Sequence, residues 1–384
     1  MKIPFNIPYF SGNENSYISD VLNHTHYDKH ESFTDKCINR IKREFNYRNI
    51  YLTSSCTAAL EASALALEIK KGDEIIVPSF TFPSTANAFI RQGANLVFAD
   101  SRIDHPGMDE NRMESLITNK TRAIVPVHYA GVACDMDKII KIAEKHGLFI
   151  IEDAAHSFGS SYKSKPLGSF GQLACLSFHQ SKNLQCEAGG AIIINDKKLL
   201  DRVAAIIEKG TNRIEFLSGK VDRYEWVEIG SSCRMSELHA AFLFAQLEKA
   251  DWIKSNRLHL WYLYFNSLKI LEDKGLLKLP YIPDYADHNA HTFYLVLKNQ
   301  KALTNLMDFL KAKEIQTVVH YTSLENSIFW KKNHNTDGKN INSLHYNDCL
   351  MRLPLYNSMI EDEILYVIEN ILDFFNVPTQ TDKV

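Results

Sequence analysis

The chain has 384 residues, a length that allows two or three domains and one large buried core. Its 43 basic and 46 acidic side chains nearly balance, so neither nucleic acid nor an anionic membrane surface is expected as the main partner. The seven cysteines are odd in number, scattered and never in a C-x-x-C pair, which predicts free thiols in a reducing compartment and neither a metal site nor a disulfide framework.

The N-terminal segment gives no sign of targeting to a membrane. Residues 1–12 are interrupted by an asparagine and two prolines, so they lack the apolar core of a signal peptide. No stretch approaches the roughly 18 apolar residues that a transmembrane helix needs. The sequence therefore predicts a soluble, cytoplasmic protein.

The first 250 residues show a regular alternation. An extended N-terminal arm (1–30) overlaps the first of two amphipathic helices, expected around 14–22 and 33–45, and the polar connector 24–32 joins them. Short apolar runs then alternate with helical patterns. The runs lie at 51–53, 74–77, 95–99, 123–127, 149–152, 173–178 and 191–195, and the helical patterns at 57–70, 84–92, 109–117 and 135–146. This alternation predicts a mostly parallel sheet with helices on both faces, which binds ligands beyond the carboxyl ends of its strands.

The remainder of the chain has a different pattern of predicted helices and strands. A helix ends at Lys209, a polar loop runs to Gly230, and a long helical region begins at Met235. From about residue 275, strands at 292–297 and 317–321 and helices at 302–312 and 361–375 predict a smaller α+β region, and the polar stretch 331–340 predicts a loop. We expect a large domain of residues 1–250 and a small domain of residues 251–384.

The connector between the last two strands of the large domain carries Lys182. Ser177 lies five positions before it, and small residues surround it. A lysine on a short connector suits an amine that must bond covalently to a carbonyl and still swing. Most lysines are solvated surface residues, so the indication depends on the rest of the chain.

Other strand ends carry residues of the same kind of site. Asp153 follows a buried strand and can pair with a cationic ring nitrogen, with His156 close behind; taken alone, a helix cap and a structural histidine are the commoner roles. Cys56 and Thr57 open a helix, where hydroxyl and N–H groups either bind a phosphate or merely cap the helix. Phe82 follows another strand, where its ring can cover a planar cofactor or belong to the core.

Together these features match the needs of pyridoxal 5'-phosphate: an amine for the Schiff base, an acid for the pyridinium nitrogen, a stacking ring and a phosphate cup. No G-x-G-x-x-G follows the first strand and no G-x-x-x-x-G-K-[ST] occurs anywhere in the chain. Dinucleotide and Walker-type sites therefore lose their main support.

Several stretches match a known family almost from end to end. They are 3–6, 78–88, 125–134, 152–155, 177–179 with 182–183, 208–213, 229–232 and 353–355. On these residues the sequence resembles the DegT/DnrJ/EryC1/StrS sugar aminotransferases. The resemblance implies an α/β fold of type I among pyridoxal-phosphate enzymes, with a mostly parallel mixed sheet and a smaller C-terminal α+β domain. It also implies a homodimer with shared active sites.

The resemblance implies a role for each candidate residue. Lys182 would form the Schiff base and act as the catalytic base, while Asp153 would keep the pyridine nitrogen protonated. The other expected cofactor contacts are His156 at the ring hydroxyl, Phe82 on the ring face, Cys56, Thr57 and Ser177 at the phosphate, and Ser232, reaching the phosphate from the partner subunit in place of the family's asparagine. The expected substrate-binding residues are Tyr27, His320 and Tyr321.

The implied reaction is ping-pong transamination between L-glutamate and dTDP-4-keto-6-deoxyglucose. The likeness favours the galacto configuration of the new amine at C4, and the gluco product remains an open alternative. Amination at C3 and an inactive cofactor-binding regulatory protein are more remote alternatives. A deoxygenating dehydratase of this fold would carry histidine in place of Lys182, which argues against that activity.

Three segments depart from the family pattern. The connector 24–32 replaces a glycine-rich segment, a Y-x-P-L-H motif becomes Tyr321-Thr-Ser-Leu-Glu325, and the run 183–188 differs in length and content. We expect all three to line the substrate side of the site. The sequence therefore predicts the cofactor chemistry more firmly than the identity of the sugar.

Overall fold

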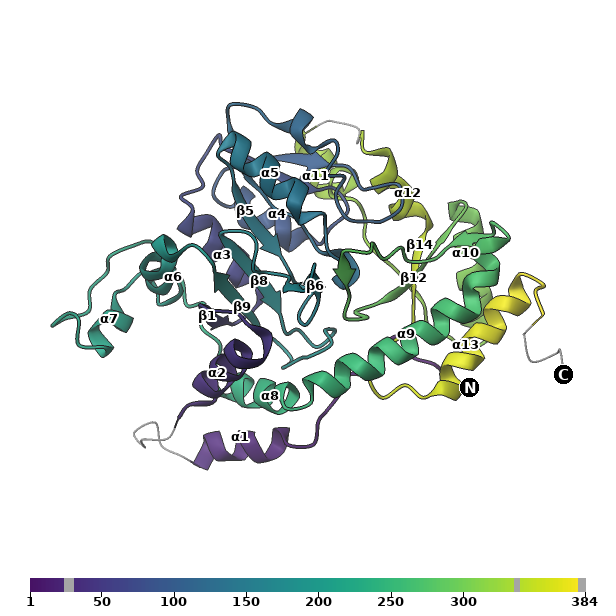
Figure 1. Ribbon diagram of the computed structural model, residues 1–384, viewed down its shortest axis with the longest axis horizontal. Helices are drawn as coiled ribbons and strands as arrows, with labels where there is room; N and C mark the ends of the chain where they lie inside the picture. The colour runs from purple at the N-terminus through teal and green to yellow at the C-terminus, as the bar shows by residue number, and fades with distance from the viewer. Residues whose placement is uncertain (24–30, 335–338, 379–384) are drawn as a thin grey trace.

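A seven-stranded sheet forms the centre of the computed structural model, which describes residues 1–23, 31–334 and 339–378 (Figure 1). The strands lie in the order β1-β9-β8-β5-β4-β2-β3. Their bounds are β1 (Ile50–Thr53), β2 (Glu74–Pro78), β3 (Asn95–Ala99), β4 (Thr121–Ile124), β5 (Phe149–Asp153), β8 (Leu173–Ser177) and β9 (Gly190–Ile194). Only β9 runs against its neighbours, being antiparallel to both β1 and β8. The predicted mostly parallel mixed sheet is confirmed.

Helices cover both faces of this sheet because its strands are apolar on both sides. In β2, Ile75 and Val77 pack on one face with α3 and α4, whereas Ile76 packs on the other face with α5. The helices around the sheet are α1 (Glu14–Asn23), α2 (Phe33–Phe45), α3 (Cys56–Ala66), α4 (Pro83–Ile90), α5 (Met136–His146), α6 (Leu200–Ile207), α7 (Arg213–Leu217) and α8 (Glu237–Leu247). A separate small sheet comprises β6 (Ser161–Tyr162), β7 (Lys165–Pro166) and β11 (Ala286–Asp287).

A second sheet, entirely antiparallel, forms in the C-terminal part of the chain. Its strands are β10 (Leu277–Lys278), β12 (Phe293–Leu297), β14 (Leu350–Leu353) and β13 (Val318–Val319), in that order. The helices of this part are α9 (Ala250–Asp273), α10 (Gln300–Ala312), α11 (Ile328–His334), α12 (Ile341–Cys349) and α13 (Glu361–Phe374). A separate apolar core joins the sheet to α9, α10 and α13, and Ile3 of the N-terminal arm bridges to Ile315. The domain boundary at residue 250 stays a prediction.

Two predictions for loops and helices were wrong. The helix expected at 109–117 is reduced to the 3-10 turn η1 (Met113–Leu116). The loop predicted at 331–340 begins inside α11, while residues 335–338 lie outside the described residues. The sequence patterns also missed α12 and β14, which follow each other without a connecting loop.

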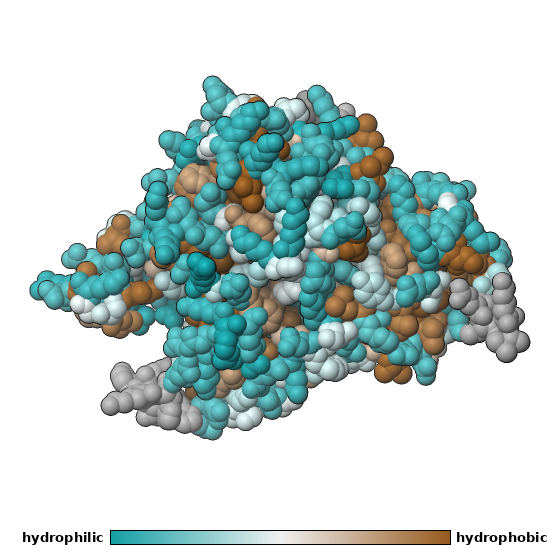
Figure 2. Space-filling view, in the orientation of Figure 1, coloured by the Kyte–Doolittle hydropathy of each residue, from teal (hydrophilic) through white to brown (hydrophobic). Residues whose placement is uncertain are grey.

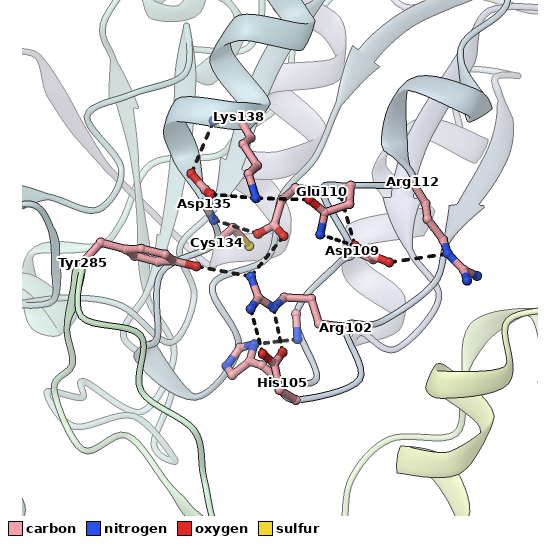
Figure 3. A network of polar contacts seen from close by, with 12 residues as sticks. Arg102, His105, Asp109, Glu110, Arg112, Cys134, Asp135, Lys138 and Tyr285 are labelled. Carbon is pink, nitrogen blue, oxygen red and sulfur yellow. Dashed lines mark hydrogen bonds and ion pairs between the residues drawn. The ribbon is translucent and has the colours of Figure 1, made fainter.

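A buried polar network explains why the segment after β3 is not a helix (Figure 3). Glu110 accepts hydrogen bonds from the Asp135 amide at 2.7 Å and from Arg102 Nη1 at 3.5 Å. Arg102 also forms a two-point ion pair with Asp104, with both bonds at 2.8 Å. Burial raises the pKa of Glu110, so this carboxylate depends on its partners. The network therefore fixes an irregular backbone in place of the helical pattern.

Asp100, at the end of β3, joins the two sheets. Its carboxylate accepts from the amides of Asn342 at 3.2 Å and Ser343 at 2.8 Å, in the first turn of α12. A carboxylate is favourable there because the first-turn amides have no partners within the helix. Since β14 directly follows α12, this contact sets the position of β14 relative to the seven-stranded sheet.

Glu152 organises the strand end that carries Asp153. Its fully buried carboxylate accepts from the amides of Gly168, Phe170 and Gly171 at 2.7–2.8 Å and from His128 Nε2 at 3.0 Å. The Cys134 amide donates to the other nitrogen of His128, so the His128 proton lies on Nε2. Four donors thus converge on one side chain.

Replacing Glu152 by glutamine is expected to destabilise the fold. Glu152→Gln keeps the shape of the side chain but turns an amide donor toward backbone N–H groups, at a cost of about 1.5–3 kcal/mol in the free energy of unfolding. Urea denaturation measures this loss. The control is Glu114→Gln, whose carboxylate binds Lys145 at the surface, and which should unfold at nearly the wild-type urea concentration. Equal stability of the two variants would contradict the role given to Glu152.

Candidate active site

A cavity of about 500 Å³ lies between the carboxyl ends of the parallel strands, the connector 177–190 and the C-terminal sheet. Nearly all the residues proposed from the sequence line it. They are Cys56, Thr57, Phe82, Asp153, His156, Ser177, Lys182, His320 and Tyr321. Ser232 is not among the lining residues of its own chain, and Tyr27 lies outside the described residues. The two sheets and their connections together gather residues that are up to 265 positions apart, from Cys56 to Tyr321.

The start of α3 forms a cup on one side of the cavity. Ser55 caps the helix by accepting from the Ala58 amide at 3.0 Å, and the first-turn amides have no carbonyl before them to bind. Thr57 Oγ1 lies 2.8 Å from Ser84 Oγ. A Cβ on Gly190 would lie 2.4 Å from the Cys56 nitrogen, so β9 approaches this cup as closely as a glycine allows. The cup suits a phosphate group.

Asp153 ends β5 at the floor of the cavity. Oδ2 accepts from Thr85 Oγ1 at 2.7 Å, and Oδ1 accepts from the Ala155 amide at 3.2 Å. Burial raises the pKa of Asp153. A cationic ring nitrogen beside the carboxylate would oppose this shift and favour the ionised form.

Lys182 projects into the same cavity from the connector. Its amide donates to the His179 carbonyl at 2.8 Å, which closes the turn that carries the side chain. Burial lowers the pKa of Lys182 from 10.5 to about 8, while Cys56 and Asp153 act in the opposite direction. An amine that titrates near neutrality is a better nucleophile and base than a surface lysine.

His156 is a neutral ring in a stack of histidines. The Ala130 amide donates to its Nδ1 at 3.2 Å, so the proton lies on Nε2, which donates to Tyr321 Oη at 3.3 Å. Burial lowers the pKa of His156 well below the usual value. The ring stacks on His291, with centroids 4.3 Å apart.

Two of the three unusual segments line the cavity through one residue each, Ala188 and Tyr321. Within 183–188, Asn183 is buried and donates to the Asn289 carbonyl at 2.7 Å, and Ala188 alone lines the cavity. Glu325 is buried and accepts from Ser79 Oγ at 3.0 Å and from amides that follow α11. The expectation that these segments line the substrate side was therefore wrong for Asn183 and Glu325. The connector 24–32 lies mostly outside the described residues.

The sequence patterns missed several residues of the cavity wall. Phe5 and Asn6 of the N-terminal arm, His291 and Arg352 all line it, and Thr85 supports Asp153. Arg352 directly precedes the stretch 353–355 that matched the family. That adjacency was the one available signal, because a single arginine in a short apolar strand has no periodic pattern.

These residues fit pyridoxal phosphate. The α3 cup offers amides to a phosphate, Asp153 is a buried acid for a ring nitrogen, and Lys182 is an amine that titrates near neutrality. Phe82 is 57% exposed despite its size, which leaves one face of its ring free to stack. The fold and the site together define a pyridoxal-phosphate-dependent enzyme of fold type I.

Comparison with known proteins identifies the family to which the chain belongs. The sequence profile of the DegT/DnrJ/EryC1/StrS aminotransferase family matches residues 9–372, and the chain belongs to this family. It is 30% identical to the spore coat polysaccharide biosynthesis protein SpsC of Bacillus subtilis (strain 168), over 97% of this chain and 96% of that protein. It is also 30% identical to GDP-perosamine synthase of Escherichia coli O157:H7, over 97% and 99%. The protein is therefore a pyridoxal-phosphate-dependent sugar aminotransferase.

Solved structures share the whole fold. The putative sugar aminotransferase Spr1654 from Streptococcus pneumoniae, in its PLP form, superposes with a TM-score of 0.87 at 24% identity, covering 96% of this chain and 97% of that one. DesV of S. venezuelae superposes with a TM-score of 0.85 at 26% identity, covering 97% and 98%. The fold class predicted from the sequence is thus confirmed.

Three further observations apply to the described residues as a whole rather than to the cavity. All seven cysteines are free, as the sequence predicts. Within the described ranges, no three histidine, cysteine or carboxylate side chains gather as metal ligands would. In the same ranges, no helix is both long and apolar enough for a membrane span.

The low pKa of Lys182 can be measured without the cofactor. In the apoprotein, acetylation of Lys182 by acetic anhydride should rise with pH through a midpoint of about 8, because the neutral amine alone reacts. Asp153→Asn should lower the midpoint, since the carboxylate raises the pKa of the lysine. Mass spectrometry of the Lys182 peptide gives the profile, with N-acetyl-lysine amide as the reference. A midpoint near 10.5 would show that the amine is not desolvated.

Proposed function

We propose that the protein transfers the amino group of L-glutamate to C4 of dTDP-4-keto-6-deoxyglucose, with the galacto product, dTDP-4-amino-4,6-dideoxygalactose, favoured. Family membership supports sugar transamination, and the sequence resemblance supports the dTDP-linked 4-keto sugar. The observation that carries the reaction type is the buried Lys182, with a pKa of about 8, in one cavity with Asp153 and the α3 cup.

When bound, the cofactor supplies an electrophilic carbon and an electron sink. Lys182 Nζ would accept a proton in the amino-donor half-reaction and return one to the sugar in the second half-reaction. Asp153 would hold a proton on the ring nitrogen, with its carboxylate oriented by Thr85 and the Ala155 amide. His156, held neutral with its proton on Nε2, would orient Tyr321 at the substrate side.

The identity of the sugar substrate has less support than the transfer of the amino group. His320 and Tyr321 line the cavity and are proposed to contact the sugar nucleotide, together with Tyr27. A relative named GDP-perosamine synthase favours a second candidate, a GDP-linked 4-keto sugar, at the same site. The gluco product from the dTDP-linked sugar is the other alternative, since it requires only that the opposite face of C4 be presented.

We also propose a homodimer in which Ser232 completes the partner's phosphate site. The segment 213–230 projects from the body of the molecule at α7 and carries exposed apolar side chains (Figures 1 and 2). These side chains are Phe216, Leu217, Tyr224, Trp226, Val227 and Ile229. Exposed apolar residues gathered on one segment favour an interface. Ser232 lies two residues beyond this segment.

The product identifies the reaction. Wild-type protein incubated with L-glutamate, pyridoxal phosphate and dTDP-4-keto-6-deoxyglucose should give an aminated sugar whose H3–H4 proton coupling is small, which is the mark of an axial amine at C4. A large coupling would establish the gluco product. Product from the GDP-linked sugar alone would assign the other nucleotide.

Lys182→Ala tests the assignment of the base. The variant should bind cofactor and sugar nucleotide but form no product, because no other side chain can replace the amine. Lys120→Ala removes an exposed lysine and should keep full activity. Substantial transamination by Lys182→Ala would refute the assignment.

The proposed interface predicts a change in assembly. Replacing Trp226 and Ile229 together by serine should shift the protein toward monomers in sedimentation velocity and weaken its activity, because both side chains are exposed on the projecting segment. Ile328→Ser on α11 is the control, since Ile328 is 88% exposed but lies elsewhere. A wild-type monomer, or an unchanged dimer in the double variant, would exclude this interface.

A further inference from the structure

We propose that His291 accepts a hydrogen bond from the C3 hydroxyl of the keto sugar, an inference that rests on the proposed transamination. His291 lies two residues before β12, at the wall of the cavity that also contains Lys182. Its ring is buried except for 8% of its surface. The proton transfers proposed for Lys182 and Asp153 make no use of this ring, although it belongs to the same cavity.

Asn183, the residue after Lys182, fixes the tautomer of His291. Asn183 Nδ2 donates to the Asn289 carbonyl at 2.7 Å, so Oδ1 is the amide atom that faces His291 Nδ1, at 3.0 Å. An amide oxygen can only accept, and the proton of His291 therefore lies on Nδ1. Nε2 is left with a lone pair, which makes it a hydrogen-bond acceptor.

This nitrogen is available to a ligand. The ring of His291 lines the cavity, and in the described part of the chain no group hydrogen-bonds to its Nε2. His105 and His288 also have an Nε2 without a partner, but in both of them that atom is sealed from solvent, whereas Nε2 of His291 is not. Since the rest of the ring is buried, the accessible edge is the one that faces the cavity.

His291 can serve only as an acceptor at this position. Burial lowers its pKa well below the usual value, and the neighbouring groups that act in the same direction are His156, Lys182, Arg257 and Arg352. A neutral ring with its proton on Nδ1 cannot donate from Nε2, so it does not bind carboxylate or phosphate oxygens. The ligand group that it binds must carry a hydrogen, as a hydroxyl or an N–H does.

The position of His291 favours the C3 hydroxyl among these groups. His291 stacks on His156 with ring centroids 4.3 Å apart, and it interacts electrostatically with Lys182, which must reach C4 of the sugar. Of the two ring carbons bonded to C4, C5 carries a methyl group and C3 carries a hydroxyl. The N–H of the nucleotide base is separated from C4 by the hexose, the diphosphate and the ribose. The amino group of L-glutamate is the other donor that comes close to Lys182.

Two substitutions separate the roles of the two ring nitrogens. His291→Asn can place an amide N–H at the position of Nδ1 and has no atom at the position of Nε2. His291→Gln reaches the position of Nε2 with an amide oxygen. Wild-type holoenzyme should use dTDP-4-keto-6-deoxyglucose about 10-fold better in kcat/KM than the 3-deoxy analogue. His291→Asn should abolish this preference, and His291→Gln should keep most of it.

The kinetics of the two half-reactions distinguish the sugar from the amino donor. In a ping-pong reaction, kcat/KM for L-glutamate reports the first half-reaction alone, and it should be unchanged in both variants. His259→Asn, at an exposed histidine that pairs with Glu361, is the matched control and should keep the wild-type preference. Circular dichroism and the Tm verify that each variant is folded.

A binding measurement separates this inference from the proposed function. In Lys182→Ala loaded with pyridoxamine phosphate, calorimetric titration should show the same preference for the sugar with its C3 hydroxyl, and adding His291→Asn should remove it. The GDP-linked 4-keto-6-deoxy sugar and its 3-deoxy analogue are titrated in parallel, so a wrongly named nucleotide would not hide the effect. A preference that persists in His291→Asn, or a loss confined to L-glutamate, would overturn the inference alone. Binding of neither sugar would refute the proposed function and this inference with it.

Discussion

The site depends on one topological constraint, the reversal of β9 within an otherwise parallel sheet. A parallel crossover after β8 would carry the chain to the opposite edge of the sheet. Because β9 instead runs back beside β8, the connector 177–190 stays at the carboxyl edge. Asp153 is paired in register with Cys175 of β8, so the acid and Lys182 meet at the same edge. Gly190 then lets β9 approach the start of α3, which brings the cup to the lysine.

Desolvation makes this edge reactive. Burial lowers the pKa values of Lys182 and His156 and raises that of Asp153, so each shift favours the uncharged form of its group. Such opposed shifts in one cavity are typical of catalytic sites. Burying these ionisable groups costs free energy, which buried hydrogen bonds elsewhere in the fold offset. An example is the set of four donors on Glu152, one residue before Asp153.

Sequence patterns predicted the parts of the fold that follow a period. All seven strands of the main sheet were predicted because each is a short apolar run, and several residues of the cavity were proposed because they stand at or just beyond strand ends. Predictions from periodicity failed where specific side-chain interactions determine the local structure. The Arg102–Glu110 network replaces a helix, and β14 was missed because it is short and contains Arg352. Glu325 and Asn183 looked like substrate residues because they depart from a family pattern, but burial and hydrogen bonds show that they support the fold.

The two sides of the cavity are fixed by different kinds of interaction. The cofactor side is built from strand ends, whose positions follow from the hydrogen bonds of the whole seven-stranded sheet. The facing side comes from β14 and the segment around Tyr321, and the side-chain contacts that join it to the sheet include Asp100 to α12 and Glu325 to Ser79. The reacting lysine and the residues that face it thus come from different parts of the fold, so function resides in a site supported by the fold rather than in the fold itself.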